Sequence, residues 1–188
     1  MSFSPITLTF QFLYGMVRIL KPKKILETGT FKGVCSSYMA SALKENGFGD
    51  ITTIEYNEGL IEEAKKLWDK LGLSLLVNSL KGLSYNLNTY EEYELIFLDT
   101  EPEVRFQELV KFYPNLKEGG FVFIHDLGRD MSQLTHNPDH PTVDPWPFGP
   151  IPQEMMQWLK EGQLVKFHFP NPRGLVGFYK SHLGDFKI

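Results

Sequence analysis

The segment 24–43, KILETGTFKGVCSSYMASAL, holds an acidic residue and two glycines at a spacing that suits ligand binding. A short apolar run leads into a turn with Glu27, Gly29 and Gly33, and a helical pattern follows. Glycines let a ligand come close to the backbone, and a helix that begins near Gly33 points free N–H groups at the same place. The spacing Glu-x-Gly-x-x-x-Gly lacks the Gly-x-Gly-x-x-Gly of dinucleotide-binding turns. A carboxylate at the end of the first strand therefore favours a cationic ligand over a pyrophosphate.

A second acidic residue, Glu55, closes the apolar run 51–54. It lies roughly twenty residues beyond the glycines, where an acidic side chain hydrogen-bonds ribose hydroxyls in nucleotide-binding α/β folds. The sequence therefore predicts that Glu55 binds a ribose.

Asp99 ends the apolar run of YELIFLD, and His125 and Asp126 end the run of FVFIHD. Two such runs predict adjacent parallel strands, whose carboxyl ends lie at one edge of a sheet. A pair of carboxylates can hold Mg²⁺ or another divalent cation, which lowers the pKa of a substrate hydroxyl. Without a metal, His125 is the nearest candidate for a general base. A side chain at the end of a buried strand can equally make a structural hydrogen bond, so both roles stay open.

The segment ILETGTFKGVCSSYMA resembles the first motif of class I S-adenosylmethionine-dependent methyltransferases. It is most similar to the small-molecule O-methyltransferases of the catechol, caffeoyl-CoA and sugar types. The resemblance implies that Glu27, Gly29, Gly33 and Ser36 hold the methionine part of the cofactor. It also implies that Glu55 binds the ribose. The further cofactor-binding residues that it implies are Ser79, or its neighbour Asn78, beside the adenine, and Asp99.

In metal-dependent members of this family the residues that match Asp99 and Asp126 are metal ligands, and an Asn commonly follows the second. In this chain that position is Leu127. The resemblance therefore leaves open whether a divalent cation binds Asp99 and Asp126. Other side chains that could complete a ligand set are Glu101, Asp130, Asp139 or a histidine. His136 and His140 are alternatives to His125 as the general base.

The elements that must position these residues alternate between strand and helix patterns along the chain. Expected strands are 25–27, 51–54, 73–78, 93–99, 121–125, 164–169 and 175–180, and expected helices are 6–20, 34–43, 57–71, 100–116 and 153–161. Residues 117–120 read as a turn, and the short link 170–174 requires an antiparallel hairpin. The predicted fold is a Rossmann-like three-layer α/β/α sandwich, with a mostly parallel seven-stranded sheet and a C-terminal antiparallel hairpin. Residues 1–188 form one domain, in which 127–152 is expected to be a lid loop.

The amino-acid composition argues against several classes of function and site. The net charge is −4 and no basic run occurs, which argues against nucleic-acid binding. A single cysteine excludes an internal disulfide and a cysteine-based zinc site. Residues 1–20 match neither a secretory signal nor a membrane span, so a cytoplasmic location is the default expectation. A homodimer is left open.

The leading hypothesis is an S-adenosylmethionine-dependent methyltransferase that methylates an oxygen of a small hydroxylated molecule. The alternative is a non-catalytic Rossmann-like module that binds S-adenosylmethionine. A nicotinamide oxidoreductase is disfavoured by the glycine spacing and by the terminal hairpin.

Overall fold

The computed structural model describes residues 5–126, 151–169 and 174–182. Its centre is one seven-stranded sheet in the order β3-β2-β1-β4-β5-β7-β6. Strands β1 to β5 are parallel, whereas β7 runs antiparallel to both of its neighbours, β5 and β6. The predicted fold class, including the terminal hairpin, is therefore confirmed. The strands are β1 (Lys24–Thr28), β2 (Asp50–Glu55), β3 (Val77–Lys81), β4 (Tyr93–Leu98), β5 (Leu116–His125), β6 (Leu164–Phe169) and β7 (Leu175–Lys180).

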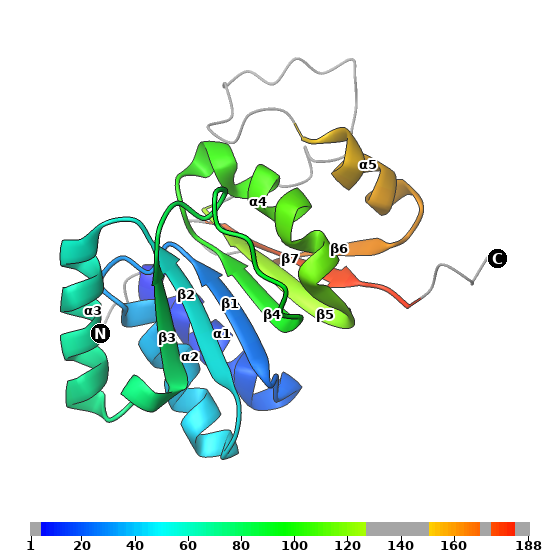
Figure 1. Ribbon diagram of the computed structural model, residues 1–188. Coiled ribbons are helices and arrows are strands. Elements are labelled where there is room, and N and C mark those ends of the chain that lie inside the picture. Colours follow the sequence, from blue (N-terminus) through cyan, green and yellow to red (C-terminus); the bar gives the residue numbers. More distant parts are fainter. Residues whose placement is uncertain (1–4, 127–150, 170–173, 183–188) are drawn as a thin grey trace.

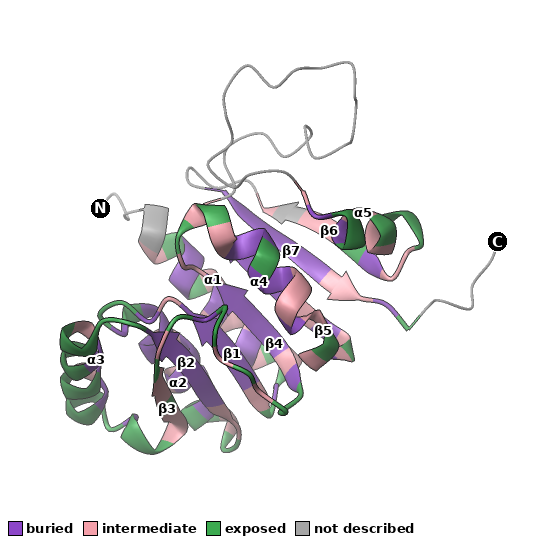
Figure 2. Cartoon of the chain, turned by 45° about the horizontal axis from the view of Figure 1, so that its top comes forward, coloured by how far each residue is buried: buried purple, intermediate pink, exposed green. Residues whose placement is uncertain are grey.

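Helices cover both faces of this sheet, as Figure 1 shows. Alternate residues of each strand point to opposite faces, so neighbouring apolar residues enter two separate cores. Ile25, Leu95 and Phe123 pack with the first three helices, and Leu26 and Ile96 pack with the last two. In Figure 2 the central strands are accordingly buried along most of their length. The helices are α1 (Pro5–Leu20), α2 (Val34–Asn46) and α3 (Glu58–Leu71) on one face, and α4 (Arg105–Phe112) and α5 (Gln153–Lys160) on the other.

The helix ends follow the local sequence signals. The Asn57 side chain accepts a hydrogen bond from the Leu60 amide and caps α3, as expected of an asparagine at this position. Gly72 ends the same helix in the left-handed conformation, which a residue without a Cβ adopts at little cost. Among the described helices, none combines the length and the apolar character needed to cross a membrane.

The third strand begins later than predicted. The apolar run 73–78 was expected to be extended, but Ser74–Leu76 form a 3-10 turn and β3 starts at Val77. Leu73 is buried and its amide donates to the Trp68 carbonyl, so it belongs to the end of α3. Leu75 is fully exposed. The prediction was wrong because part of this apolar run terminates a helix and does not enter the sheet.

The segment after β4 is also divided differently. The predicted helix 100–116 consists of a 3-10 turn (Pro102–Val104), α4, and a second 3-10 turn (Tyr113–Asn115). Pro114 lacks an amide hydrogen and prevents α4 from continuing. Residues 117–120, predicted as a turn, lie within β5, where the pairing register with β4 shifts. Gly119 has a φ of 78°, as expected of an irregularity in a strand. The predicted lid, 127–152, lies outside the described residues except for Ile151 and Pro152.

Candidate active site

A cavity of about 710 Å³ lies at the carboxyl ends of β1, β2, β3 and β4. This is the edge at which open α/β sheets bind ligands. Its walls are the β1–α2 turn, the start of α2, the end of β2 with Tyr56, the loop after β3 and the loop after β4, with Phe10 of α1 and Leu60 of α3. Three predicted site residues from separate strands, Gly29, Glu55 and Asp99, line it together.

Glu55, the last residue of β2, is held rigidly at the cavity wall. Its Oε2 accepts a hydrogen bond of 2.9 Å from the Phe31 amide, and its Oε1 accepts one of 3.0 Å from the Asn57 amide. The residue is only 7% exposed. Each carboxylate oxygen has a second lone pair, so Glu55 can still accept hydrogen bonds from a ligand hydroxyl.

Glu27 is a completely buried carboxyl in the middle of the first motif. Its Oε2 accepts a hydrogen bond of 2.6 Å from the Thr53 hydroxyl. Its Oε1 and the buried Ser36 Oγ make no well-formed hydrogen bond to another described residue. Burial raises the pKa of Glu27 from 4.5 to about 7, and hydrogen bonding from Thr53, Ser36 and Cys35 opposes that rise. Glu27 Oε1 and Ser36 Oγ therefore keep capacity to bond a polar ligand.

The two glycines of the motif have protein neighbours that explain them. Gly29 has a φ of 82°, and a Cβ there would lie 2.2 Å from the Asp99 carbonyl oxygen. At Gly33, with a φ of 72°, a Cβ would lie 2.7 Å from the Ala64 Cβ, and Trp68 Nε1 donates to the Gly33 carbonyl. Both glycines were expected to let a ligand approach the backbone. The structure shows that the contact of Gly29 with Asp99 and the contact of Gly33 with α3 already require them.

Asp99, His125 and Asp126 come together at the ends of β4 and β5, as predicted. His125 Nδ1 lies 3.1 Å from Asp99 Oδ1 and 3.6 Å from Asp126 Oδ2. His125 is completely buried, and its Nε2 lies 3.3 Å from the Thr9 hydroxyl of α1. A carboxylate only accepts, so Nδ1 carries the proton and donates to Asp99. Both ring nitrogens therefore have protein partners, and Asp99 is the member of this cluster that lines the cavity.

Arg105, the first residue of α4, joins this cluster and was missed by the sequence analysis. Its Nη2 lies 3.1 Å from Asp99 Oδ1 and 3.8 Å from Asp126 Oδ2. Its Nε donates to the Thr100 carbonyl at 2.8 Å, and its Nη1 donates to the His125 carbonyl. The side chain is only 4% exposed. Arg105 thus places a buried positive charge between the two aspartates.

Glu108 is the second buried charged residue of α4. Its carboxylate accepts hydrogen bonds from Thr28 and Thr100 at 3.1 and 2.7 Å, and a third from Ser84. Burial raises its pKa, and these bonds oppose the rise. Glu108 thereby joins the end of β1 to the loops after β3 and β4.

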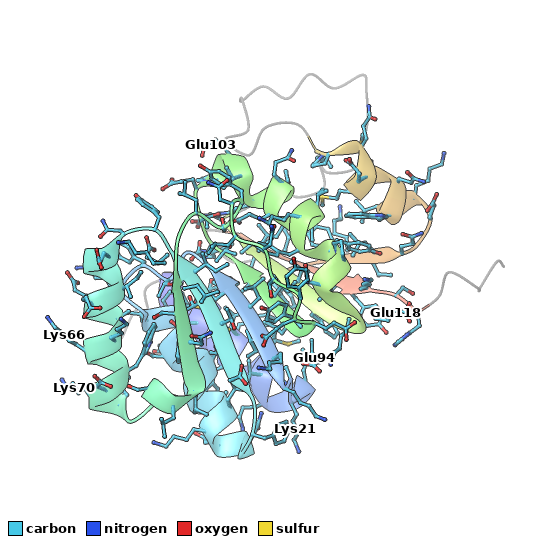
Figure 3. All side chains as sticks on the ribbon, in the orientation of Figure 1. Lys21, Lys66, Lys70, Glu94, Glu103 and Glu118 are labelled. Atoms are coloured by element: carbon cyan, nitrogen blue, oxygen red, sulfur yellow. The ribbon has the colours of Figure 1, made fainter. Side chains whose placement is uncertain are left out.

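A sequence signal for both residues existed. Arg105, Glu108, Leu109 and Phe112 follow the spacing of one buried helix face, and all four are buried. Charged residues of this protein more commonly project outward, as Lys66, Lys70 and Glu103 do in Figure 3. A charged residue on the apolar face of a helix therefore indicates a candidate site residue.

The predicted adenine contact is displaced because β3 starts late. Ser79 lies inside β3, paired in register with Thr53, and does not line the cavity. The loop 82–85 takes that place, and its Ser84 lines the cavity. Glu27, Gly33 and Ser36 do not line the cavity. Asp130, Asp139, His136 and His140 lie outside the described residues.

Known proteins resemble this chain both in sequence and in fold. The family model described as "Methyltransferase domain" matches residues 26–127. A catechol O-methyltransferase of Niastella koreensis is 29% identical over 140 residues, which are 71% of this chain and 62% of that protein. The chain therefore spans less than two thirds of this relative's length.

Solved structures are similar over nearly the whole chain. The methyltransferase PaMTH1 of Podospora anserina, bound to SAH, superposes with a TM-score of 0.72 and 20% identity, covering 96% of this chain and 80% of that one. The O-methyltransferase TomG of Streptomyces achromogenes, in complex with SAM, has a TM-score of 0.73 and 17% identity, with coverage of 96% and 82%. Identities this low show a shared fold. The match of the family model over more than half of the sequence shows that the chain belongs to the methyltransferase domain family.

Proposed function

We propose that this protein is an S-adenosylmethionine-dependent methyltransferase that methylates an oxygen of a small hydroxylated molecule. The observation that carries the proposal is the cavity at the carboxyl edge of the sheet, with Glu55 on its wall, together with the incompletely bonded Glu27 and Ser36 of the first motif. Family membership and the SAM- and SAH-bound structural relatives support the same cofactor.

The proposed cofactor contacts follow from the bonding capacity of each residue. Glu27 Oε1 and Ser36 Oγ are both buried and make no well-formed hydrogen bond to another described residue, so they suit the ammonium group of the methionine part. Glu55 accepts from the ribose hydroxyls with its remaining lone pairs. Ser84, in the loop after β3, replaces Ser79 as the candidate beside the adenine.

We place the methyl acceptor at the side of the cavity formed by Asp99. Methyl transfer from a sulfonium is an in-line displacement, so the protein contributes chiefly the position of the acceptor oxygen and the removal of its proton. Asp99 lines the cavity and can accept a hydrogen bond from an acceptor hydroxyl. His125 and Arg105 hold the Asp99 carboxylate in place, and Asp126 lies beside it.

Isothermal titration with S-adenosylmethionine, S-adenosylhomocysteine and NAD tests the cofactor. We expect micromolar binding of the two sulfur compounds and none of NAD. Glu55→Ala should weaken that binding by roughly tenfold to a hundredfold, since a hydrogen bond to a charged group contributes about 1.5–3 kcal/mol. The matched control is Glu62→Ala, because Glu62 is an exposed residue of α3 paired with Lys65.

Binding of the sulfur compounds would justify a screen of hydroxylated acceptors with labelled methyl groups. A folded protein that binds neither compound, or that binds NAD instead, would refute the proposal. Equal affinities of wild type and Glu55→Ala would refute the role of Glu55 and leave the cofactor assignment standing.

A further inference from the structure

We infer that the Arg105 guanidinium takes the place of a divalent cation between Asp99 and Asp126, so that this carboxylate pair binds no divalent metal ion. Asp99, His125 and Asp126 have ligand atoms within 4.8 Å of one another, which is the arrangement of a candidate metal site. That arrangement already contains a cation of the protein itself.

The guanidinium lies close to both carboxylates. Arg105 Nη2 lies 3.1 Å from Asp99 Oδ1 and 3.8 Å from Asp126 Oδ2, so one nitrogen is close to a carboxylate oxygen of each aspartate. Mg²⁺ and Ca²⁺ need oxygen ligands at about 2.0–2.6 Å from the ion. An ion at that distance from the same oxygens would lie beside a buried like charge.

Arg105 is also held by backbone carbonyls, independently of the two carboxylates. Its Nε and Nη2 donate to the Thr100 carbonyl at 2.8 and 2.5 Å, and its Nη1 donates to the His125 carbonyl. If the side chain turned away to admit a metal, these carbonyls would lose charge-assisted hydrogen bonds in a buried place. The guanidinium is therefore fixed by the backbone of the loop after β4 and of the end of β5.

Both ring nitrogens of His125 already have protein partners. Its Nδ1 donates to Asp99, and its Nε2 lies 3.3 Å from the Thr9 hydroxyl. A histidine ligates through an unprotonated nitrogen, so a metal at this place would have to displace the Asp99 contact. In sequence, Leu127 follows Asp126 and offers no side-chain oxygen.

Arg105 is accordingly a positioning residue and not a catalytic one, because it is 4% exposed and does not line the cavity. Its charge keeps two neighbouring carboxylates together at the end of the sheet. If the protein transfers methyl groups as proposed, it should do so without an added metal. Only this consequence rests on the proposed function.

Manganese binding tests the inference without cofactor or acceptor. The electron paramagnetic resonance signal of free Mn²⁺ is followed while wild-type protein, Asp99→Asn and Asp126→Asn are added. Mn²⁺ accepts the same oxygen ligands as Mg²⁺. We expect no Mn²⁺ binding that differs between wild type and the two variants. Micromolar binding by wild type that is lost in both variants would overturn the inference.

The second measurement looks for Mn²⁺ binding that appears when the positive charge of Arg105 is removed. Arg105→Met removes the positive charge at similar length, and we expect it to bind Mn²⁺ in an Asp126-dependent manner, which the double variant with Asp126→Asn should abolish. Circular dichroism checks that each variant is folded. If Arg105→Met does not fold, the comparison of wild type with the aspartate variants decides the question alone. Titration of wild type with S-adenosylmethionine, done separately, shows whether the proposed function fails independently.

Discussion

Replacing Glu27 by glutamine should make the protein without cofactor more stable and its cofactor affinity weaker. Glu27 is completely buried, and one of its carboxyl oxygens makes no well-formed hydrogen bond to another described residue. Glutamine keeps the shape of the side chain and an oxygen that can accept from Thr53. It removes the charge that burial disfavours.

The magnitude follows from the pKa of this carboxyl. A rise from 4.5 in the unfolded chain to about 7 in the folded protein corresponds to roughly 3 kcal/mol. The folded state holds the proton more tightly, so this group lowers the free energy of unfolding as pH rises from about 4.5 to about 7. Below that window both states are protonated, and the group has no effect. Above it the full cost of the buried charge is present.

Urea unfolding of wild type and Glu27→Gln between about pH 5 and pH 8 measures this cost. The variant should gain stability relative to wild type as pH rises, by up to roughly 3 kcal/mol, and the difference should level off above about pH 7. Titration calorimetry of the same proteins should show weaker binding of S-adenosylmethionine by the variant, since an ammonium group loses its carboxylate partner. A stability difference that does not change with pH would refute the assigned pKa. Unchanged affinity would refute the contact with the cofactor.

Two further substitutions test the packing that positions the site, both by urea unfolding. Gly29 and Gly47 share a φ of 82°. A Cβ added at Gly29 would clash with the Asp99 carbonyl, whereas a Cβ added at Gly47 would have no atom within 4 Å. We expect Gly47→Ala to cost about 1–2 kcal/mol and Gly29→Ala clearly more; equal costs would show that the contact with Asp99 is unimportant. Glu108→Ala should cost about 3 kcal/mol, because Thr28, Thr100 and Ser84 lose their acceptor in a buried place. Glu103→Ala is its control, because Glu103 is exposed. Similar small losses of unfolding free energy in both variants would contradict the buried network.

Much of the site could be predicted because parallel strands bring their carboxyl ends to one edge. Glu55 and Asp99 each end an apolar run, and that placement alone predicts that they meet at one cavity. His125 and Asp126 follow from the same rule. The length of a strand is less certain than its existence, and the late start of β3 moved Ser79 away from the cavity.

Arg105 and Glu108 could not be assigned from the sequence because their partners are distant in the chain. Arg105 contacts the backbone of His125, and Glu108 contacts Thr28 on another strand. A local pattern contains neither contact. The pattern does show a charged residue on a helix face that is otherwise apolar. Only the fold shows that buried polar groups of other elements lie opposite that face.

The order of the last three strands has a consequence for how the chain is assembled. Strand β6 precedes β7 in sequence but reaches the sheet only through it, because β7 pairs with both β5 and β6. While the chain is being synthesised, β6 therefore has no strand to join until 175–180 have emerged. Until then β5 is an open edge whose Val122 and Ile124 lack their later neighbours Phe178 and Val176. The final strand closes an edge that would otherwise be free to pair with another chain.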